Sequence, residues 1–252
     1  MTHTFTHDRG VAADLQTSMS RIGVAADLAG RRAFVRCSTD AATGAPVVRP
    51  VLLHSGASSA SLCLVPEGAL LLAGDSIRLE VDVGPGCAVE IREPAGSVAY
   101  DMRGASARWD VHLRIGAGAS LVWHGEPFVV AQGARVLRTL TGSLGSGARL
   151  MLRETLVLGR TGETAGGVQT HTHLADGTRP VLVEHLTLGS GGQFPAALGS
   201  HRVLDSVISL RPRPVAIESA APRYNLESGG SLWRVLAGDT HRTGLDAVWA
   251  DL

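Results

Sequence analysis

The sequence predicts a mainly β protein, an elongated stack of antiparallel hairpins with little helix. Two observations indicate this class: apolar and polar residues alternate with a period of two over many short segments, and glycine-rich turns separate those segments at regular intervals. A helical spacing of apolar residues is clear only near the C-terminus. All-β folds reach 252 residues as one unit, so we expect residues 1–252 to form a single domain.

The clearest strands are predicted at residues 76–83 and 107–115. In residues 76–83 the odd positions hold Ile, Leu or Val, and the even positions after Ser76 are charged. In residues 107–115 the odd positions are again apolar, while the even positions hold Arg, Asp, His and Arg. This alternation is typical of half-buried strands in an antiparallel sheet with one face in water.

A Gly-x-Gly turn follows each of these strands and begins another alternating run. The turns start at Gly84, Gly116 and Gly145, and they lead into residues 87–91, 119–123 and 148–152. Their spacings are 32 residues (84 to 116) and 29 residues (116 to 145), which indicates a degenerate internal repeat. Each turn is followed by a strand pattern and not by a helix, so none is a nucleotide-binding motif. We expect hairpins stacked side by side.

Additional strands and one short helix complete the expected elements. Asp176-Gly177 is the predicted two-residue loop of a hairpin. From Thr240 onward, Leu245, Val248, Trp249 and Leu252 are spaced as one apolar stripe of a short helix, which packs either on its own sheet or on a partner. The remaining strands are expected at residues 33–38, 47–54, 126–130, 135–141, 154–158, 168–174, 180–188, 202–210 and 213–218.

Charge and composition exclude several classes of function. The 23 basic and 23 acidic residues cancel, so no long-range field attracts nucleic acid or anionic lipid. Every basic residue is Arg, and the absence of Lys excludes Schiff-base chemistry and a phosphate-loop lysine. No apolar run is long enough to span a membrane, and the N-terminus lacks the apolar region of a signal peptide.

The three cysteines, Cys37, Cys63 and Cys87, are odd in number and form no Cys-x-x-Cys pair. This spacing argues against a disulfide framework or a zinc knuckle and favours a reducing, cytoplasmic location.

One pair of histidines is a candidate metal site. His171 and His173 are two residues apart on a predicted strand, so their side chains share a face. If Asp176-Gly177 is the hairpin loop, Glu184 falls opposite Gln169 on that same face. This arrangement would suit a cupin-type metal-dependent enzyme, and a solvated polar strand face is the alternative. No Gly-x-Ser-x-Gly nucleophile motif is present.

Several short motifs resemble a known family in their order and spacing. They include Ala73-Gly-Asp-Ser-Ile-Arg-Leu-Glu-Val, Pro94-Ala-Gly-Ser-Val-Ala-Tyr100, Leu121-Val-Trp-His-Gly-Glu-Pro127, Gly159-Arg-Thr-Gly-Glu163, Arg179-Pro-Val-Leu-Val-Glu-His-Leu, Trp233-Arg-Val-Leu-Ala-Gly-Asp and the closing Trp249-Ala-Asp-Leu252. Together they resemble the urease accessory protein UreD, called UreH in some organisms. The resemblance covers roughly residues 50–252, residues 1–45 match poorly, and the chain departs from the family pattern at Ala73, Val98 and Gly125.

The resemblance implies a non-enzymatic, cytoplasmic scaffold with a helix-like β stack. Such proteins bind the accessory protein UreF, which recruits the GTPase UreG, and present the complex to apo-urease for insertion of nickel. It implies no tightly bound cofactor and only transient nickel. Within the motifs, we expect Gly159, Arg160, Gly162 and Glu163, with Tyr100, to form a structural and partner-facing corner in which Arg160 makes forked hydrogen bonds.

A carrier of nickel needs weak ligands in series, because a tightly held ion is released slowly. Scattered carboxylates in the family-like core meet this requirement. We therefore expect Asp75, with Glu154 or Glu163, to line a polar route through the β stack. A turn-capping role for Asp75, which follows a glycine, is the alternative.

Overall fold

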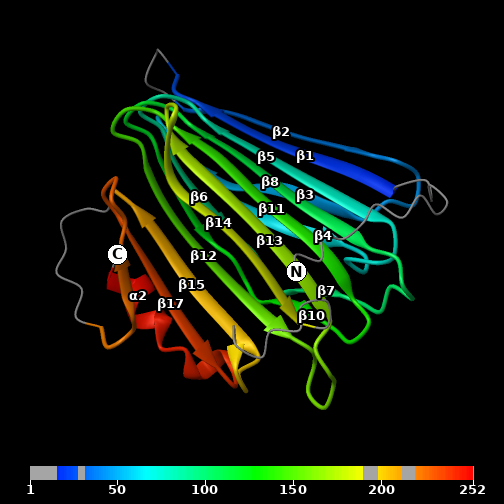
Figure 1. Ribbon diagram of the computed structural model, residues 1–252. Coiled ribbons are helices and arrows are strands. Elements are labelled where there is room, and N and C mark those ends of the chain that lie inside the picture. Colours follow the sequence, from blue (N-terminus) through cyan, green and yellow to red (C-terminus); the bar gives the residue numbers. More distant parts are fainter. Residues whose placement is uncertain (1–15, 28–31, 190–197, 212–218, 252) are drawn as a thin grey trace.

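Two β-sheets face each other across a continuous apolar core in the computed structural model, which describes residues 16–27, 32–189, 198–211 and 219–251 (Figure 1). The first sheet has the strand order β14-β13-β11-β8-β5-β1-β2. Its strands are β1 (Gln16–Ala25), β2 (Phe34–Ala41), β5 (Asp75–Val83), β8 (Ala107–Ile115), β11 (Arg135–Leu144), β13 (Gly167–Asp176) and β14 (Arg179–Gly189).

The second sheet has the order β16-β17-β15-β12-β9-β6-β4-β3, and β7 and β10 pair beside β12. Its strands are β3 (Val47–Ser55), β4 (Ser59–Glu67), β6 (Ala88–Arg92), β7 (Ser97–Ala99), β9 (Ser120–His124), β10 (Phe128–Val130), β12 (Arg149–Leu158), β15 (Val203–Leu210), β16 (Arg223–Asn225) and β17 (Ser231–Ala237). In Figure 1, β1 and β2 (blue) lie at one end of the stack, and β15 and β17 (orange to red) lie at the other.

The central chain coils between the two sheets in the manner of a β-solenoid. Strands β5, β8, β11 and β13 pair in parallel in the first sheet, while β4, β6, β9 and β12 pair in parallel in the second. The predicted mainly β, helix-like stack with little helix is thereby confirmed. The prediction of hairpins at the Gly-x-Gly turns is wrong, because the strands before and after each turn lie in opposite sheets. Antiparallel pairs occur toward the ends of the sheets, for example β1 with β2 and β13 with β14.

The Gly-x-Gly turns are the corners of the coil, and they stack on one another. A Cβ atom on Gly116 would lie 2.7 Å from the backbone nitrogen of Pro85, and one on Gly145 would lie 2.7 Å from that of Ala117. The second glycine of each turn has a positive φ, as Gly118 does at 64°. The first glycine thus permits close approach of successive coils, and the second permits the bend.

Most predicted strands are present, with boundaries that move by a few residues. The separate runs at 148–152 and 154–158 form the single strand β12, and the predicted strand at 126–130 shortens to β10. The predicted ranges contain no strand at β1, β4, β7, β16 or β17. In β1, the alternation of apolar and polar residues is obscured because Ser18 and Ser20 occupy buried positions on its core face. The predicted strand at 213–218 lies outside the described residues.

The C-terminal helix packs on its own sheet. A 3₁₀ turn at Thr240–Arg242 precedes α2 (Leu245–Asp251), so the α-helix begins later than expected, after Gly244 with φ +68°. Leu245 and Val248 of the predicted stripe are fully buried in a cluster with Val207 of β15 and Trp233 of β17. Leu252 lies outside the described residues. No helix in the described segments has the length and hydrophobicity needed to cross a membrane.

Candidate functional site: polar cavities between the sheets

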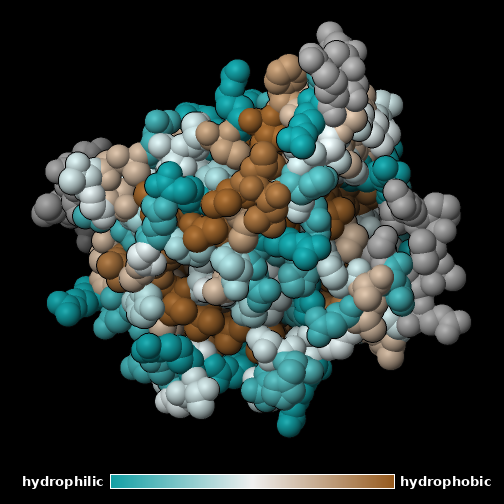
Figure 2. Space-filling view, turned by 180° about the vertical axis from the view of Figure 1, so that it is seen from behind, coloured by the Kyte–Doolittle hydropathy of each residue, from teal (hydrophilic) through white to brown (hydrophobic). Residues whose placement is uncertain are grey.

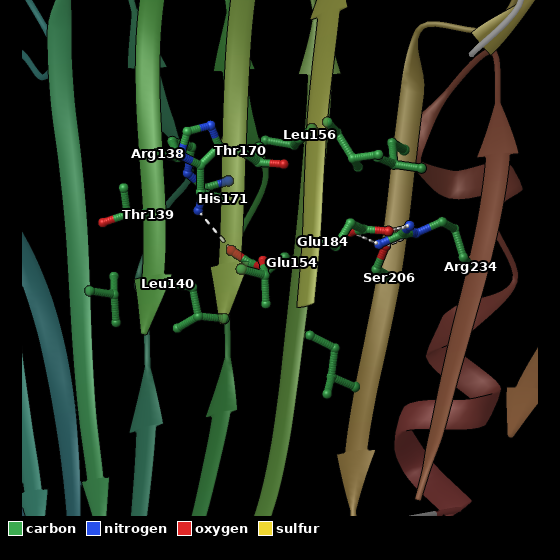
Figure 3. A pocket seen from close by; sticks show the side chains of 15 residues that line it. Arg138, Thr139, Leu140, Glu154, Leu156, Thr170, His171, Glu184, Ser206 and Arg234 are labelled. Carbon is green, nitrogen blue, oxygen red and sulfur yellow. Dashed lines mark hydrogen bonds and ion pairs between the residues drawn. The ribbon is translucent and has the colours of Figure 1, made fainter. Parts of the chain in front are cut away.

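Two small cavities lie between the sheets, separated by an ion pair. Their volumes are about 40 Å³ and 30 Å³, enough for about two water molecules each. Arg138 of β11 and Glu154 of β12 line both cavities. The Arg138 Nη2 atom donates to Glu154 Oε1 at 3.0 Å, and Figure 3 shows the two side chains directed toward each other. The interior is therefore charged at the point where the cavities meet.

Arg138 enters the core because β11 turns this position toward the second sheet. Val136 and Leu140, its neighbours on the same face, are both buried. The guanidinium lies over the Phe128 ring, 4.6 Å from its centroid. Its buried Nε atom has no hydrogen-bond partner among the described residues, although a buried donor usually has one. Arg138, which lines both cavities, thus keeps one donor unused.

A second ion pair borders the larger cavity and joins the two sheets near one end of each. The Nη1 and Nη2 atoms of Arg234 in β17 donate to the two carboxylate oxygens of Glu184 in β14, at 2.5 Å and 2.8 Å. Its Nε donates to Ser206 Oγ at 3.0 Å (Figure 3). Planar bidentate pairing of this kind gives strong and directional contacts. Arg234 thereby holds Glu184 inward and balances its negative charge.

The smaller cavity contains a carboxyl group without an arginine partner. Glu93 accepts hydrogen bonds from the Trp123 indole at 3.0 Å and from the Glu126 backbone N–H at 3.1 Å. Burial raises the pKa of Glu93 to about 7, although these two hydrogen bonds and the more distant charge of Arg138 lower it. Glu93 therefore exchanges a proton near neutral pH.

Of the carboxylates expected to line a polar route, only Glu154 lies at these cavities. Asp75 is buried at the start of β5, where its Oδ2 accepts the Leu72 backbone N–H at 2.5 Å, and burial raises its pKa. This is the turn-capping arrangement that the sequence left open. Glu163 lies in a surface turn with Arg160. The structure does not bring the three carboxylates together.

Residues 159–163 form a tight corner. Gly159 has a φ of +78°, and its N–H donates to Val130 O at 2.7 Å. The Glu163 carboxylate accepts from Arg160 Nε at 2.8 Å, and from the backbone N–H groups of Arg160 and Gln132. The hydrogen bonds with Arg160 lower the pKa of Glu163 to about 2. The forked contact predicted for Arg160 is present, and its partner is this carboxylate.

The remaining corner residues lie nearby in the coil. Gly162 has a φ of +81° with open space around it, as a turn requires. Tyr100 follows β7 in the adjacent coil, where the Ala131 N–H donates to Ala99 O and the Tyr100 N–H donates to Leu71 O. The corner is structural, and its role toward a partner stays a prediction.

The proposed cupin-type grouping of His171, His173 and Glu184 is wrong in its register. The turn comprises Gly177 and Thr178, and a bulge at Leu174/Ala175 shifts the pairing further. Glu184 consequently lies opposite Thr172 and not Gln169. A shift of three residues reverses the face, because side chains alternate along a strand. Glu184 points into the molecule toward Arg234, whereas the histidines lie on the outer face.

No group of three or more His, Cys, Asp or Glu side chains suited to a metal ion occurs among the described residues. Burial lowers the pKa of His171, with smaller contributions from His185 and Arg108. His171 is therefore neutral at pH 7.

Sequence reasoning missed Glu93, Arg138 and Arg234, although two of them carry a recognisable signal. Arg138 interrupts the apolar phase of β11 between Val136 and Leu140. Arg234 does the same in β17 between Leu232 and Leu236. A charged residue in the apolar phase of a strand indicates a buried ion pair, because an unpaired buried charge is costly.

Known proteins that resemble the chain are urease accessory proteins. Residues 22–249 match the family model described as UreD urease accessory protein. The chain is 47% identical over 155 residues to urease accessory protein UreD 1 of Streptomyces griseus, an alignment covering 61% of each chain. It is 35% identical over 180 residues to UreD 2 of Saccharopolyspora erythraea, which covers 69% of this chain and 62% of the relative.

A third relative, UreD of Frankia casuarinae, is 34% identical over 205 residues, covering 74% of this chain and 64% of its own length. The chain thus spans less than two thirds of the length of these relatives. All three are named as accessory proteins and not as enzymes, in agreement with the expectation of a non-enzymatic protein. Since the family model matches residues 22–249 of 252, the chain belongs to the UreD urease accessory protein family.

Proposed function

We propose that this protein acts in the cytoplasm as a scaffold for urease maturation. With UreF and the GTPase UreG it binds apo-urease and helps to deliver nickel to the urease active site. The family match carries this proposal. The absence of lysine supports assigning GTP hydrolysis to a partner, since this sequence contains no phosphate-loop lysine.

Exposed apolar side chains support a role in an assembly. On edge strand β3, Val51, Leu52 and Leu53 are exposed, and Phe34 of β2 is 68% exposed. Figure 2 shows hydrophobic side chains gathered in stripes on the back of the molecule. Apolar surface of this kind is typical of protein–protein contacts.

Nickel delivery through this protein would use the cavities between the sheets. Glu184, Glu154 and Glu93 follow one another along them, and each offers carboxylate oxygens, which bind divalent nickel weakly. Arg138 and Arg234 hold the first two in place and reduce their affinity for a cation. Weak ligands in series allow an ion to move on, so the route depends on Glu154 at the junction and not on Asp75 or Glu163.

The scaffold proposal predicts a specific effect of Arg160→Ala. The change leaves the Glu163 carboxylate without its guanidinium and loosens the corner at residues 159–163. We expect weaker retention by immobilised UreF or a lower melting temperature. Arg114→Ala, which breaks an exposed pair with Asp82 on the first sheet, is the control. If Arg160→Ala matches the unmodified protein in both measurements, the corner has no such role.

The route proposal predicts that Glu154→Gln separates folding from nickel transfer. The amide preserves side-chain volume but removes the negative charge at the junction of the cavities. We expect normal UreF retention and a reduced nickel content of urease, measured by elemental analysis after activation. Glu67→Gln removes a surface carboxylate paired with Arg49 and should leave the nickel content unchanged. Full nickel loading with folded Glu154→Gln protein would contradict the route but not the scaffold.

A further inference from the structure

Two histidines from adjacent strands lie against each other on the outer face of the β13–β14 hairpin. The register pairs His171 directly with His185. Their rings stack with centroids 4.3 Å apart and an interplanar angle of 23°. His185 is exposed and His171 is partly exposed. This contact depends on the observed register, which also turned Glu184 inward.

Two polar side chains on the β11 side of this pair, Thr139 and Asp110, already have hydrogen-bond partners. Thr139, the strand neighbour of His171 on its other side, donates to Asp110 at 2.6 Å. Asp110 also accepts two hydrogen bonds from Arg108 at 3.2 Å. Within the described part of the chain, neither imidazole makes a hydrogen bond. The ring nitrogens of His171 and His185 thus remain available to an external ligand.

The geometry suits chelation by two nitrogens. Nitrogen ligands bind first-row divalent ions at about 2.0–2.1 Å, so two of them on one ion lie roughly 3 Å apart. The stacked rings need only tilt toward each other about their side-chain torsions to reach this separation. The ladder of β13 and β14 already holds both backbones, so little conformational entropy is lost on binding.

We propose that His171 and His185 form a surface site for a divalent transition ion that prefers imidazole ligands, such as nickel, copper or zinc. Water completes the coordination sphere. The site differs from the His171–His173 pair considered from the sequence, because His173 lies opposite the apolar Val183. It is also independent of nickel delivery to urease, since it concerns the isolated protein and the face opposite Glu154.

The test is titration of the full chain with nickel chloride by isothermal calorimetry. The variants His171→Asn and His185→Asn remove one ligand each, and both positions are on the outer face, so the fold should persist by circular dichroism. We expect each change to weaken one binding event by about tenfold or more, since even loss of a supporting contact costs that much at metal sites. The double variant, which keeps neither imidazole, should bind at least as weakly as either single one.

Matched controls identify the pair. His173→Asn removes the neighbouring histidine on the same strand, and His54→Asn removes an exposed histidine of β3. Both should bind nickel as the unmodified protein does. The proposal is overturned if His185→Asn binds with unchanged affinity, or if His173→Asn abolishes the binding event while His185→Asn retains it.

Discussion

The three carboxylates along the cavities differ in what stabilises their charge. Glu154 and Glu184 each face an arginine from another strand, so their negative charge is compensated. Glu93 has only the Trp123 indole and a backbone N–H as donors. Burial consequently dominates at Glu93 and raises its pKa to about 7. One residue in the interior therefore responds to pH in the physiological range.

Glu93 should make the protein less stable as pH rises. Its folded pKa of about 7 exceeds the unfolded value of about 4.3, so the folded state binds more protons between these values. The free energy of unfolding then falls across roughly pH 4.5 to 7, by up to about 3 kcal/mol from this group.

Glu93→Gln removes this contribution, because the amide does not titrate. Urea unfolding of both proteins at pH 5 and pH 8 measures it. We expect the unfolding free energy of the unmodified protein to fall more between pH 5 and pH 8 than that of the variant. An equal change in both proteins over that interval would show that Glu93 ionises normally in the folded state.

At the scale of elements, the corners of the coil depend on close backbone contact. The Gly116 N–H donates to Val83 O at 2.7 Å, and the Gly145 N–H donates to Ile115 O at 2.8 Å, so each corner is bonded to the strand end of the coil before it. A side chain at the first glycine of a corner would push these layers apart. The internal repeat in the sequence is thus a steric requirement of stacking.

Gly116→Ala should destabilise the fold by roughly 2 kcal/mol, because its Cβ would meet the backbone of Gly84 and Pro85 at 2.7–3.0 Å. Gly23→Ala in β1 is the matched control: no atom lies within 4 Å of its Cβ, and its φ is not positive. It should leave stability unchanged or raise it by about 0.5 kcal/mol. Chemical unfolding measures both, and equal values for the two variants would contradict the steric role of the corner.

At the scale of the whole molecule, polar contacts connect the two sheets near both ends of the stack. At one end, Ser20 Oγ of β1 donates to Val48 O of β3 at 2.5 Å. At the other end, Arg234 of β17 holds Glu184 of β14. The apolar core fills the space between these contacts. The edges therefore close the sandwich around the cavities.

Arg234→Ala should cost roughly 2–3 kcal/mol of unfolding free energy, because Glu184 would remain mostly buried without a partner. The control is Arg179→Ala, since Arg179 and Glu227 form an exposed pair at 3.6 Å. Its effect should be within about 0.5 kcal/mol. Thermal and urea unfolding provide the comparison. A small effect of Arg234→Ala would mean that the contact between Arg234 and Glu184 does not stabilise the packing of the two sheets.

Patterns among neighbouring residues are enough to indicate which face of the central strands is buried, where the corners lie and which family the motifs resemble. Alternation in residues 76–83 and 107–115 marked β5 and β8, and the apolar stripe at Leu245 and Val248 marked α2. These features depend on local geometry, that is, the two-residue period of a strand, the small size of glycine and the helical repeat. Local geometry is readable from neighbouring residues.

The pairing of the strands and the meeting of distant charges depend on long-range packing, which neighbouring residues do not reveal. Alternation shows that a strand has a buried face, but it is equally consistent with a hairpin and with a corner between two sheets. A one-residue change in the turn after Asp176 and a bulge at Leu174 placed Glu184 inside and left His171 beside His185. Arg234 and Glu184 are 50 residues apart in the chain, so only the closure of the two sheets brings them together.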